Sequence, residues 1–186
     1  MALQLVKAYA PHVVLKTRSG KLGLGTAYVH GLQFAKGNFI IIMDADFSHH
    51  PKFIPQMIAL QKAHDYDIVT GTRYASGGGV FGWDLKRKLT SKGANIFADT
   101  VLRPGVSDLT GSFRLYKRAA LEKLFDATTQ RGFSMQMALA VNAKAMGFTI
   151  AEVPITFVDR VYGDSKLSAM EMVEYVKGVL QLWVQV

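Results

Sequence analysis

The sequence has 186 residues, of which 49% are hydrophobic and 19% are charged. This length and composition suit one globular domain with a sizeable core and exclude an intrinsically disordered chain. The absence of cysteine excludes a disulfide framework and a cysteine-based zinc site, and it fits a reducing compartment. The formal net charge of +8 favours anionic partners such as nucleotides, phospholipid headgroups or nucleic acid, or else a basic surface without a partner.

The hydrophobic pattern predicts helices and strands that alternate along the chain. Helices are expected over Ala2 to Tyr9, Gly25 to Ala35, Pro51 to His64, Leu85 to Leu102, Arg118 to Phe125, Met135 to Met146 and Ser168 to the end. Strands are expected over His12 to Lys16, Phe39 to Met43, Asp67 to Thr70, Phe113 to Tyr116 and Thr149 to Phe157. This order indicates an α/β sheet with helices on its faces. Ala75 to Asp84 (ASGGGVFGWD) is the only segment with the composition of a linker.

The stretch FIIIMDADFSHHP, from Phe39 to Pro51, ends an apolar strand in two aspartates. The apolar run is typical of a strand buried on both faces. Ligands of open α/β sheets bind outside the carboxyl ends of the strands, which is where Asp44 and Asp46 fall. Residues two apart in extended backbone point to the same side, so these carboxylates could hold Mg²⁺ or Mn²⁺ and, through it, a diphosphate.

Two other interpretations of the aspartate pair stay open. The pair could be solvated loop residues without a ligand. An Asp-x-Asp after an apolar strand also occurs in haloacid-dehalogenase-like phosphohydrolases, but these need Thr or Val where this chain has Ser48. The glycine-rich loop from Ser19 to Ala27 fits neither the Walker A nor the dinucleotide pattern, although its glycines allow close backbone approach to a ligand at a helix start.

Seven motifs in fixed order carry a family resemblance. They are KLGLGTAYVHG, IIIMDADFSHHP, GTRY, GGGVFGWDLKRKLTSKGAN, LRPG, DLTGSFRLY and FVDRVYGDSKL, and they extend from Lys21 nearly to the C-terminus. Together they resemble the dolichol-phosphate mannose synthase family of inverting glycosyltransferases. The resemblance implies a single domain over residues 1–186 with a GT-A (nucleotide-diphospho-sugar transferase) fold, whose mostly parallel sheet has helices on both faces.

The same resemblance implies an activity and a location. The family transfers mannose from GDP-mannose to dolichyl phosphate with Mg²⁺ or Mn²⁺, and the product, dolichyl β-D-mannosyl phosphate, serves glycan and GPI-anchor assembly. The expected location is the cytosolic face of the endoplasmic reticulum membrane, as a peripheral protein. The family's first two strands, which carry Pro-Thr-Tyr-Asn-Glu and Asp-Asp-Gly-Ser, have no counterpart here, so we expect an N-terminally truncated domain that lacks most of the nucleoside pocket.

The resemblance also implies a role for individual residues. The donor diphosphate and its metal are assigned to Asp44, Ala45 and Asp46, with the two aspartates as metal ligands. Arg73 is placed at the phosphates of donor and acceptor, and Asp46 and Arg73 are the expected catalytic residues. A loop that closes over the donor carries Arg160 and Lys166. The lipid phosphate is gripped by Arg87 and Ser91 together with Arg73. Many relatives have a glutamine as an additional metal ligand where this chain has Ser48, so water is expected at that position.

Elementary chemistry fits these assignments. The acceptor oxygen belongs to a phosphate that is already anionic at neutral pH, so no general base is required. The site must instead bring two anions together, and arginine binds phosphate through a planar fork that is always charged. A metal and cations would stabilise the charge that develops on the GDP leaving group. Direct attack on the anomeric carbon predicts inversion.

Several residues have two interpretations from sequence alone. His49 and His50 could bind metal or could cap the helix that begins near Pro51. The basic cluster of Lys86, Arg87, Lys88 and Lys92 could be a solvated helix face or a surface that meets anionic lipid near the acceptor phosphate. Phe81 and Trp83 could enter the membrane interface or belong to the core. Arg114 and Asp108 could orient the acceptor or form structural ion pairs.

The segment 167–186 is expected to be an amphipathic C-terminal helix. Its apolar face would hold Leu167, Met170, Val173, Val176, Leu180 and Trp183, and its charged residues make it unsuitable for spanning a membrane. The resemblance implies small membrane-embedded regulatory subunits as partners, with LWVQV as a candidate contact. Two alternative functions stay open: a non-catalytic truncated form that binds such subunits, and a dolichyl-phosphate glucosyltransferase that uses UDP-glucose. Nucleic-acid binding is disfavoured because no recognition motif is present.

Overall fold

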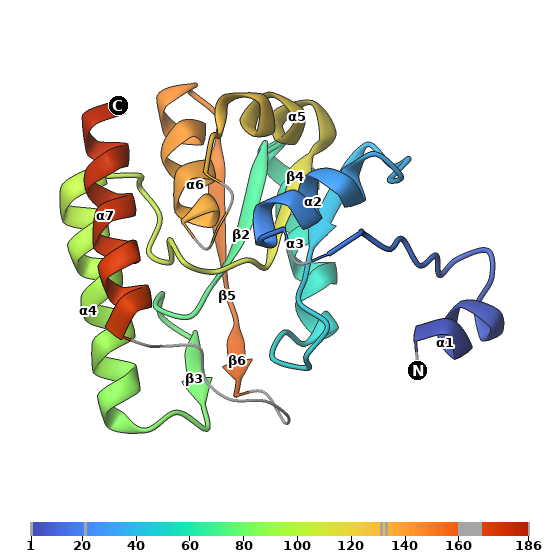
Figure 1. Cartoon of the computed structure of the whole chain (residues 1–186), viewed down its shortest axis with the longest axis horizontal. Helices are drawn as coiled ribbons and strands as arrows, with labels where there is room; N and C mark the ends of the chain where they lie inside the picture. The colour runs from blue at the N-terminus through green and yellow to red at the C-terminus, as the bar shows by residue number, and fades with distance from the viewer. Residues whose placement is uncertain (1, 21, 131, 133, 160–168, 186) are drawn as a thin grey trace.

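The computed structural model describes residues 2–20, 22–130, 132, 134–159 and 169–185 (Figure 1). Its helices are α1 (Ala2–Ala8), α2 (Leu24–Leu32), the 3-10 helix η1 (Pro51–Phe53), α3 (Ile54–His64), α4 (Leu85–Leu102), α5 (Arg118–Ala127), α6 (Met135–Ala145) and α7 (Ala169–Gln185). Its strands are β1 (Phe39–Ile42), β2 (Ile68–Thr72), β3 (Gly79–Phe81), β4 (Arg114–Lys117), β5 (Ile150–Pro154) and β6 (Thr156–Val158).

The central sheet has the strand order β1-β4-β2-β5. Strand β4 is antiparallel to both of its neighbours, whereas β2 and β5 are parallel. Three strands therefore share one direction and β4 runs against them, which makes the sheet mixed. A second, two-stranded parallel sheet of β3 and β6 lies beyond the carboxyl ends of β2 and β5 (Figure 1).

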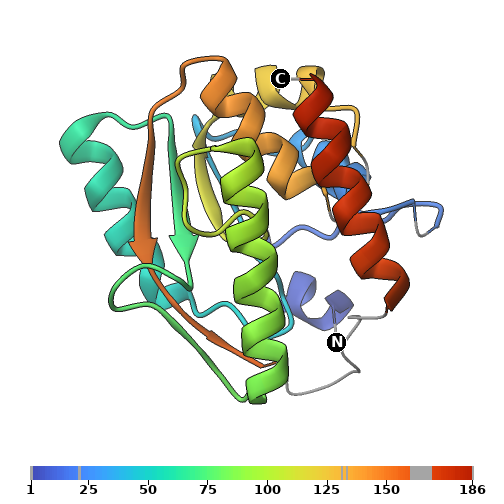
Figure 2. The ribbon, with the colours of Figure 1, turned by 90° about the vertical axis from the view of Figure 1, so that its left-hand side faces the viewer.

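Alternation along the strands sends apolar side chains to both faces of the sheet. Ile68 and Tyr116 pack with residues of α5 and α6, such as Leu124. Their sequence neighbours Val69 and Leu115 pack with Met57 of α3 on the opposite face. A period of two in a strand has this effect because successive side chains point to opposite sides. Helices thus cover both faces, as Figures 1 and 2 show, and the expected α/β class is confirmed.

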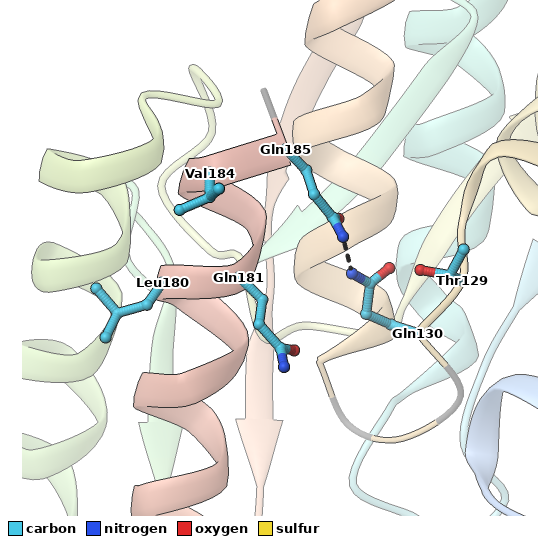
Figure 3. A pocket seen from close by; sticks show the side chains of 6 residues that line it. All are labelled: Thr129, Gln130, Leu180, Gln181, Val184 and Gln185. Atoms are coloured by element: carbon cyan, nitrogen blue, oxygen red, sulfur yellow. Dashed lines mark hydrogen bonds between the residues drawn. The ribbon is translucent and has the colours of Figure 1, made fainter.

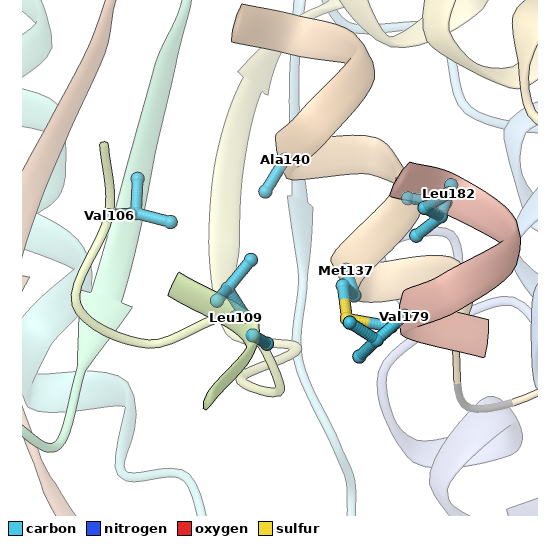
Figure 4. Packing of buried hydrophobic residues seen from close by; sticks show 8 residues of the cluster. Val106, Leu109, Met137, Ala140, Val179 and Leu182 are labelled. Carbon is cyan, nitrogen blue, oxygen red and sulfur yellow. The ribbon is translucent and has the colours of Figure 1, made fainter. Parts of the chain in front are cut away.

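A third apolar cluster joins the outer helices to the domain. Ala98 of α4 is buried in one cluster with Met137 of α6 and with Val179 and Leu182 of α7. Figure 4 shows the side chains of Met137, Val179 and Leu182. Helices α4 and α7 lie side by side (Figures 1 and 2), and the Tyr175 hydroxyl on α7 donates a hydrogen bond of 3.0 Å to the Ala94 carbonyl on α4. This packing holds α4, which carries the predicted acceptor residues Arg87 and Ser91, against the domain.

The C-terminal helix presents more apolar surface than the domain covers. Side chains of α7 that lie on the expected apolar face, Val173, Val176, Leu180 and Trp183, are exposed, while Val179 and Leu182 pack against the core. Leu167 lies outside the described residues. No helix of the described part of the chain combines the length and the apolar character needed to cross a bilayer.

Some expected elements differ from the structure. The strand predicted over His12 to Lys16 is wrong: the amides of His12 and Val13 close a turn on the Tyr9 carbonyl, and no described strand pairs with this segment. Strand β1 is only partly buried: Ile40 and Ile42 pack on one face and Ile41 on the other, but Phe39 is 49% exposed. It is an edge strand that pairs only with β4 among the described strands. The strand expected over Thr149 to Phe157 divides into β5 and β6, which pair with different partners.

Candidate functional site

The first aspartate of the pair is tethered from two sides. The chain leaves β1 at Ile42, and the Asp44 carboxylate accepts a 3.0 Å hydrogen bond from the Ser112 hydroxyl, which lies just before β4. The Asp44 amide donates to Nδ1 of His49 at 3.1 Å. The Asp44 side chain is nevertheless 38% exposed. Its carboxylate is therefore fixed in place and still accessible to a ligand.

The second aspartate is held by the turn that follows it. One oxygen of Asp46 accepts hydrogen bonds from the amide of Ser48 at 3.1 Å and from its hydroxyl at 2.5 Å. Phe47, between them, has a φ of 66°, a left-handed conformation that is unusual for a large side chain. Ser48 is buried, so its hydroxyl serves to orient Asp46. Ala45 is exposed on the outside of this turn.

The two histidines after the pair have different roles. His49 is buried, its ring stacks on Phe113 with centroids 5.1 Å apart, and Nδ1 accepts from the Asp44 amide. Burial lowers the pKa of His49, against the opposing effect of the Asp44 and Asp46 carboxylates. The His50 ring accepts the Lys52 amide at 3.0 Å and caps η1, so the capping interpretation is confirmed for His50. His49 instead supports the aspartate turn through its hydrogen bond with the Asp44 amide.

The donor set fits a metal that arrives with its substrate. Among the described residues no group of three or more His, Cys, Asp or Glu side chains could hold an ion, so the candidate ligands are the two carboxylates of the turn. The Asp44 carboxylate lies 3.9 Å from His49 Nδ1, and Asp46 is held by Ser48, the residue before that histidine. Mg²⁺ is commonly held by one or two carboxylates, water and substrate phosphates. Asp44 and Asp46 could therefore hold a divalent metal bound to a diphosphate.

Arg73, expected at the phosphates, is engaged by a buried carboxylate. Its Nε and Nη2 donate to the two oxygens of Asp108, each at 2.7 Å, and Nη2 also donates to the Thr110 hydroxyl at 2.6 Å. The Arg73 amide donates to Asp108 as well, at 3.1 Å. The side chains are only 9% and 0% exposed. The phosphate role of Arg73 stays a prediction, and Asp108 is the structural ion-pair partner that sequence left undecided.

Both members of this pair are ionised. Burial raises the pKa of Asp108, but the hydrogen bonds and charge of Arg73 outweigh that effect and hold the pKa below its ordinary value. Burial likewise lowers the pKa of Arg73, and Asp108 more than compensates. The pair fastens the start of the 73–84 segment to the loop that carries Asp108 and Thr110.

Two of the three acceptor residues of the sequence analysis, Arg87 and Ser91, lie on the first half of α4. Asp84 caps this helix by accepting the Arg87 amide at 2.7 Å, which explains why the helix begins at Leu85. Nη1 of Arg87 donates to Asp159 at 2.9 Å, and the guanidinium carbon lies 4.2 Å from the ring centroid of Trp83. Ser91 shares a 2.7 Å hydrogen bond with the Tyr74 hydroxyl. Arg160 and Lys166 lie outside the described residues.

Sequence reasoning missed a buried asparagine that connects these parts. Asn95 accepts the Leu109 amide at 2.9 Å and donates to the Ser91 carbonyl at 3.0 Å. It therefore links α4 to the loop that holds Arg73. The available signal was its position at i+4 from Ser91 and i−3 from Ala98, on the buried face of the helix.

Arg114 has a structural role. Its guanidinium donates to the carbonyls of Gln136 at 2.8 Å and Leu109 at 3.2 Å, and the side chain is buried. It also donates to the Tyr116 hydroxyl at 3.5 Å, so its hydrogen bonds to described residues are structural, and the acceptor role stays a prediction. It ties β4 to α6 and to the 107–111 loop.

Two surface hollows lie away from the aspartate turn. One, of about 650 Å³, is lined by Thr129 and Gln130 and by residues at the end of α7, with a 3.4 Å hydrogen bond between Gln130 and Gln185 (Figure 3). The other, of about 720 Å³, borders the glycine-rich loop and includes Arg18 and His30. Arg18 donates to the Thr26 hydroxyl at 2.7 Å, which braces the loop at the start of α2.

Comparison with known proteins gives consistent matches. Residues 2–125 match the family model described as Glycosyl transferase family 2. The chain is 35% identical over 178 residues to polyprenol monophosphomannose synthase of Mycolicibacterium smegmatis, covering 94% of this chain and 67% of that protein. It is 33% identical over 162 residues to undecaprenyl-phosphate mannosyltransferase of Micrococcus luteus, covering 85% of this chain and 66% of that protein. The chain thus spans about two thirds of the length of these curated relatives.

Solved structures share the fold. Glucosyl-3-phosphoglycerate synthase from Mycobacterium tuberculosis, in complex with Mn²⁺ and UDP-glucose, superposes with a TM-score of 0.60 at 18% identity, covering 92% of this chain and 55% of that one. A complex of the same enzyme with Mn²⁺, UDP and phosphoglyceric acid gives a TM-score of 0.62 at 17% identity, covering 94% of this chain and 57% of that one. These likenesses confirm the expected GT-A fold.

Proposed function

The chain belongs to glycosyl transferase family 2, and on that premise we propose that it transfers mannose from GDP-mannose to a polyprenyl phosphate with inversion. One observation carries the proposal. Side-chain contacts through His49, Phe157 and Trp83 join the aspartate turn, which suits a diphosphate, to Arg87 on α4, which suits a phosphate. A site with these two halves can hold two anionic substrates side by side.

The donor half rests on the aspartate turn. Asp44 and Asp46 would hold the metal and diphosphate of GDP-mannose, with Ser112 and Ser48 fixing their orientation. A divalent metal bound there would neutralise charge on the departing GDP. Two curated relatives are named for mannose transfer, which supports mannose as the sugar.

The acceptor half rests on α4. Arg87 and Ser91 would bind the lipid phosphate, and Arg73, which is held by Asp108, lies near them across Trp83. The exposed side of α4 carries Leu85, Leu89 and Ile96, flanked by Lys86, Lys88 and Lys92. Apolar side chains with a basic margin suit the surface of an anionic membrane, where each basic residue adds up to about 1 kcal/mol of attraction. The lipid chain of the acceptor would then enter from that surface.

The identity of the polyprenol is the finer part of the proposal. The sequence motifs resemble the dolichol-phosphate enzymes, whereas the two bacterial relatives are named for polyprenol and undecaprenyl phosphate. We infer dolichyl phosphate from the motifs, together with the cytosolic face of the endoplasmic reticulum as the location. The exposed apolar face of α7 supports a membrane-embedded regulatory subunit as a partner.

Mannosyl transfer is the direct test. The chain is incubated with radiolabelled GDP-mannose and either dolichyl or undecaprenyl phosphate, with Mg²⁺, Mn²⁺ or EDTA, and lipid-linked mannose is extracted and counted. We expect metal-dependent transfer, and the ratio between the two lipids identifies the acceptor. Transfer from UDP-glucose instead would support the glucosyltransferase alternative. Absence of transfer from either donor, in a folded chain supplied with membranes, would contradict the proposal and favour a non-catalytic role.

A further inference from the structure

A row of four aromatic rings connects the aspartate turn to helix α4. Phe113 stacks on His49 at 5.1 Å, His49 meets Phe157 edge-on at 5.4 Å, and Phe157 meets Trp83 edge-on at 5.6 Å. The Asp44 amide donates to His49, near one end of the row, and Arg87 contacts Trp83, at the other end. Rings in these arrangements pack rigidly, so the row fixes the spacing between the two halves of the site.

Trp83, at the end of this row, contacts two guanidinium groups. The carbon Cζ of Arg87 lies 4.2 Å from the indole centroid and that of Arg73 lies 5.6 Å from it. Both distances are within the range of cation–π attraction, for which tryptophan is the strongest aromatic partner. Each arginine is also held by a carboxylate, Arg87 by Asp159 and Arg73 by Asp108.

The orientation of Arg87 leaves part of its guanidinium available. Asp159 takes Nη1, and Arg87 makes no other side-chain hydrogen bond to a described residue. With its Cζ 4.2 Å from the Trp83 ring centroid and Nη1 bound to Asp159, the edge formed by Nε and Nη2 remains as a two-point donor. Phosphate is bound bidentately by such an edge, and a preorganised fork loses less entropy on binding.

Trp83 offers its ring face and not its polar atom. The indole Nε1 is buried and has no hydrogen-bond partner among the described residues. Buried tryptophan usually places this N–H on an acceptor. Here the interactions of the side chain are those of its π-system, which points to the arginines as the reason for an aromatic ring at this position.

We propose that Trp83 is a positioning residue for the acceptor phosphate: it orients the free edge of Arg87 and keeps Arg87 and Arg73 at a set distance from the donor aspartates. This inference rests on the proposed function, because it assumes that the acceptor is a polyprenyl phosphate. The inference adds that affinity for the acceptor phosphate depends on an uncharged aromatic ring as well as on the arginines.

The test uses farnesyl phosphate, a short polyprenyl phosphate, with farnesol as its neutral counterpart. For wild type, Trp83→Leu and Trp83→Phe, we would measure Kd for both compounds by calorimetry and KM for farnesyl phosphate and GDP-mannose in the transfer assay. Phe81→Leu is the matched control, because this neighbouring ring is exposed and makes no ring contact with another described residue. Thermal unfolding of each variant reports on folding.

We expect Trp83→Leu to raise both KM and Kd for farnesyl phosphate roughly five- to tenfold, while farnesol affinity and the KM for GDP-mannose stay near wild type. Trp83→Phe should restore part of the loss, since it keeps a ring face. Equal losses for both substrates, or wild-type farnesyl phosphate affinity in Trp83→Leu, would overturn the inference. If wild type binds farnesyl phosphate without transferring mannose, the proposed function fails while the Kd values still decide the role of Trp83. Failure of wild type to bind farnesyl phosphate overturns both.

Discussion

The buried pair between Arg73 and Asp108 gives the sharpest prediction about stability. In the wild type each oxygen of Asp108 lies 2.7 Å from a guanidinium nitrogen of Arg73. Asp108→Asn removes the negative charge and replaces one of these oxygens by an amide NH₂ group, which cannot accept from Arg73. The Arg73 charge, 9% exposed, would then lack its counter-ion. Breaking a buried pair in this way costs about 3–5 kcal/mol. In a chain of this length, roughly 2–4 °C of Tm corresponds to each kcal/mol, so Tm should fall by about 6–20 °C.

The assay is thermal and urea unfolding followed by circular dichroism. The matched control is Glu122→Gln, which breaks the Arg118–Glu122 pair on the surface of α5, where the glutamate is 51% exposed. Exposed pairs four residues apart on a helix contribute about 0.3–0.5 kcal/mol, so this variant should unfold near the wild-type Tm. If Asp108→Asn shifts the Tm no more than Glu122→Gln does, the reasoning that the buried pair stabilises the fold is refuted.

The same pair predicts how the difference depends on pH. The pKa of Asp108 in the folded chain lies below its ordinary value of 3.8. A carboxyl group with a depressed pKa contributes stability above the ordinary value and loses it as the pH falls through the folded pKa. The gap in unfolding free energy between wild type and Asp108→Asn should therefore be constant from neutral pH to about 5 and shrink progressively below that. A gap that narrows already near pH 6 would indicate that a different group is responsible.

Three further predictions concern the site. Asp46→Ala should abolish metal-dependent transfer while leaving Tm within a few degrees, because this carboxylate is fixed by a local turn; substantial residual transfer would remove Asp46 from the metal site. Arg73→Lys should lower both transfer and Tm, since a single ammonium cannot reproduce the two-point contact with Asp108, and near-normal turnover would show that the fork is dispensable. Replacing Lys86, Lys88 and Lys92 together by glutamine should weaken sedimentation with anionic vesicles by at least tenfold at low salt, with no change for neutral vesicles; unchanged sedimentation would remove α4 from the membrane surface.

The helices could be predicted from sequence where local signals agree. The expected helix from Leu85 to Leu102 has the bounds of α4, because Asp84 supplies a cap and the apolar spacing persists for five turns. The direction of β4 could not be predicted. β4 lies antiparallel to both β1 and β2, and the short segment from Phe113 to Tyr116 contains no signal for the direction in which it pairs.

The candidate site could be predicted as a set of residues but not as a set of contacts. The aspartate turn followed from an apolar strand and a spacing of two. The engagement of Arg73 by Asp108 did not, because the partners are 35 residues apart and either could have paired elsewhere. His12 to Lys16 had the pattern of a strand, but pattern alone provides no neighbouring strand to pair with. Long-range pairing is the information that a local reading of the chain lacks.

The segment with the composition of a linker lies beside residues of the proposed acceptor half of the site. Gly82 has a φ of 87°, and a side chain there would come within 3.0 Å of the Asp159 side chain. Gly78 packs as closely, since an added Cβ would lie 2.7 Å from the Thr72 carbonyl. Because these positions exclude side chains, β3 can pair with β6 and bring Asp159 within hydrogen-bond distance of Arg87. The glycines of this segment therefore shape the acceptor half of the site, and Gly82→Ala should reduce affinity for farnesyl phosphate in the same assay as Trp83→Leu.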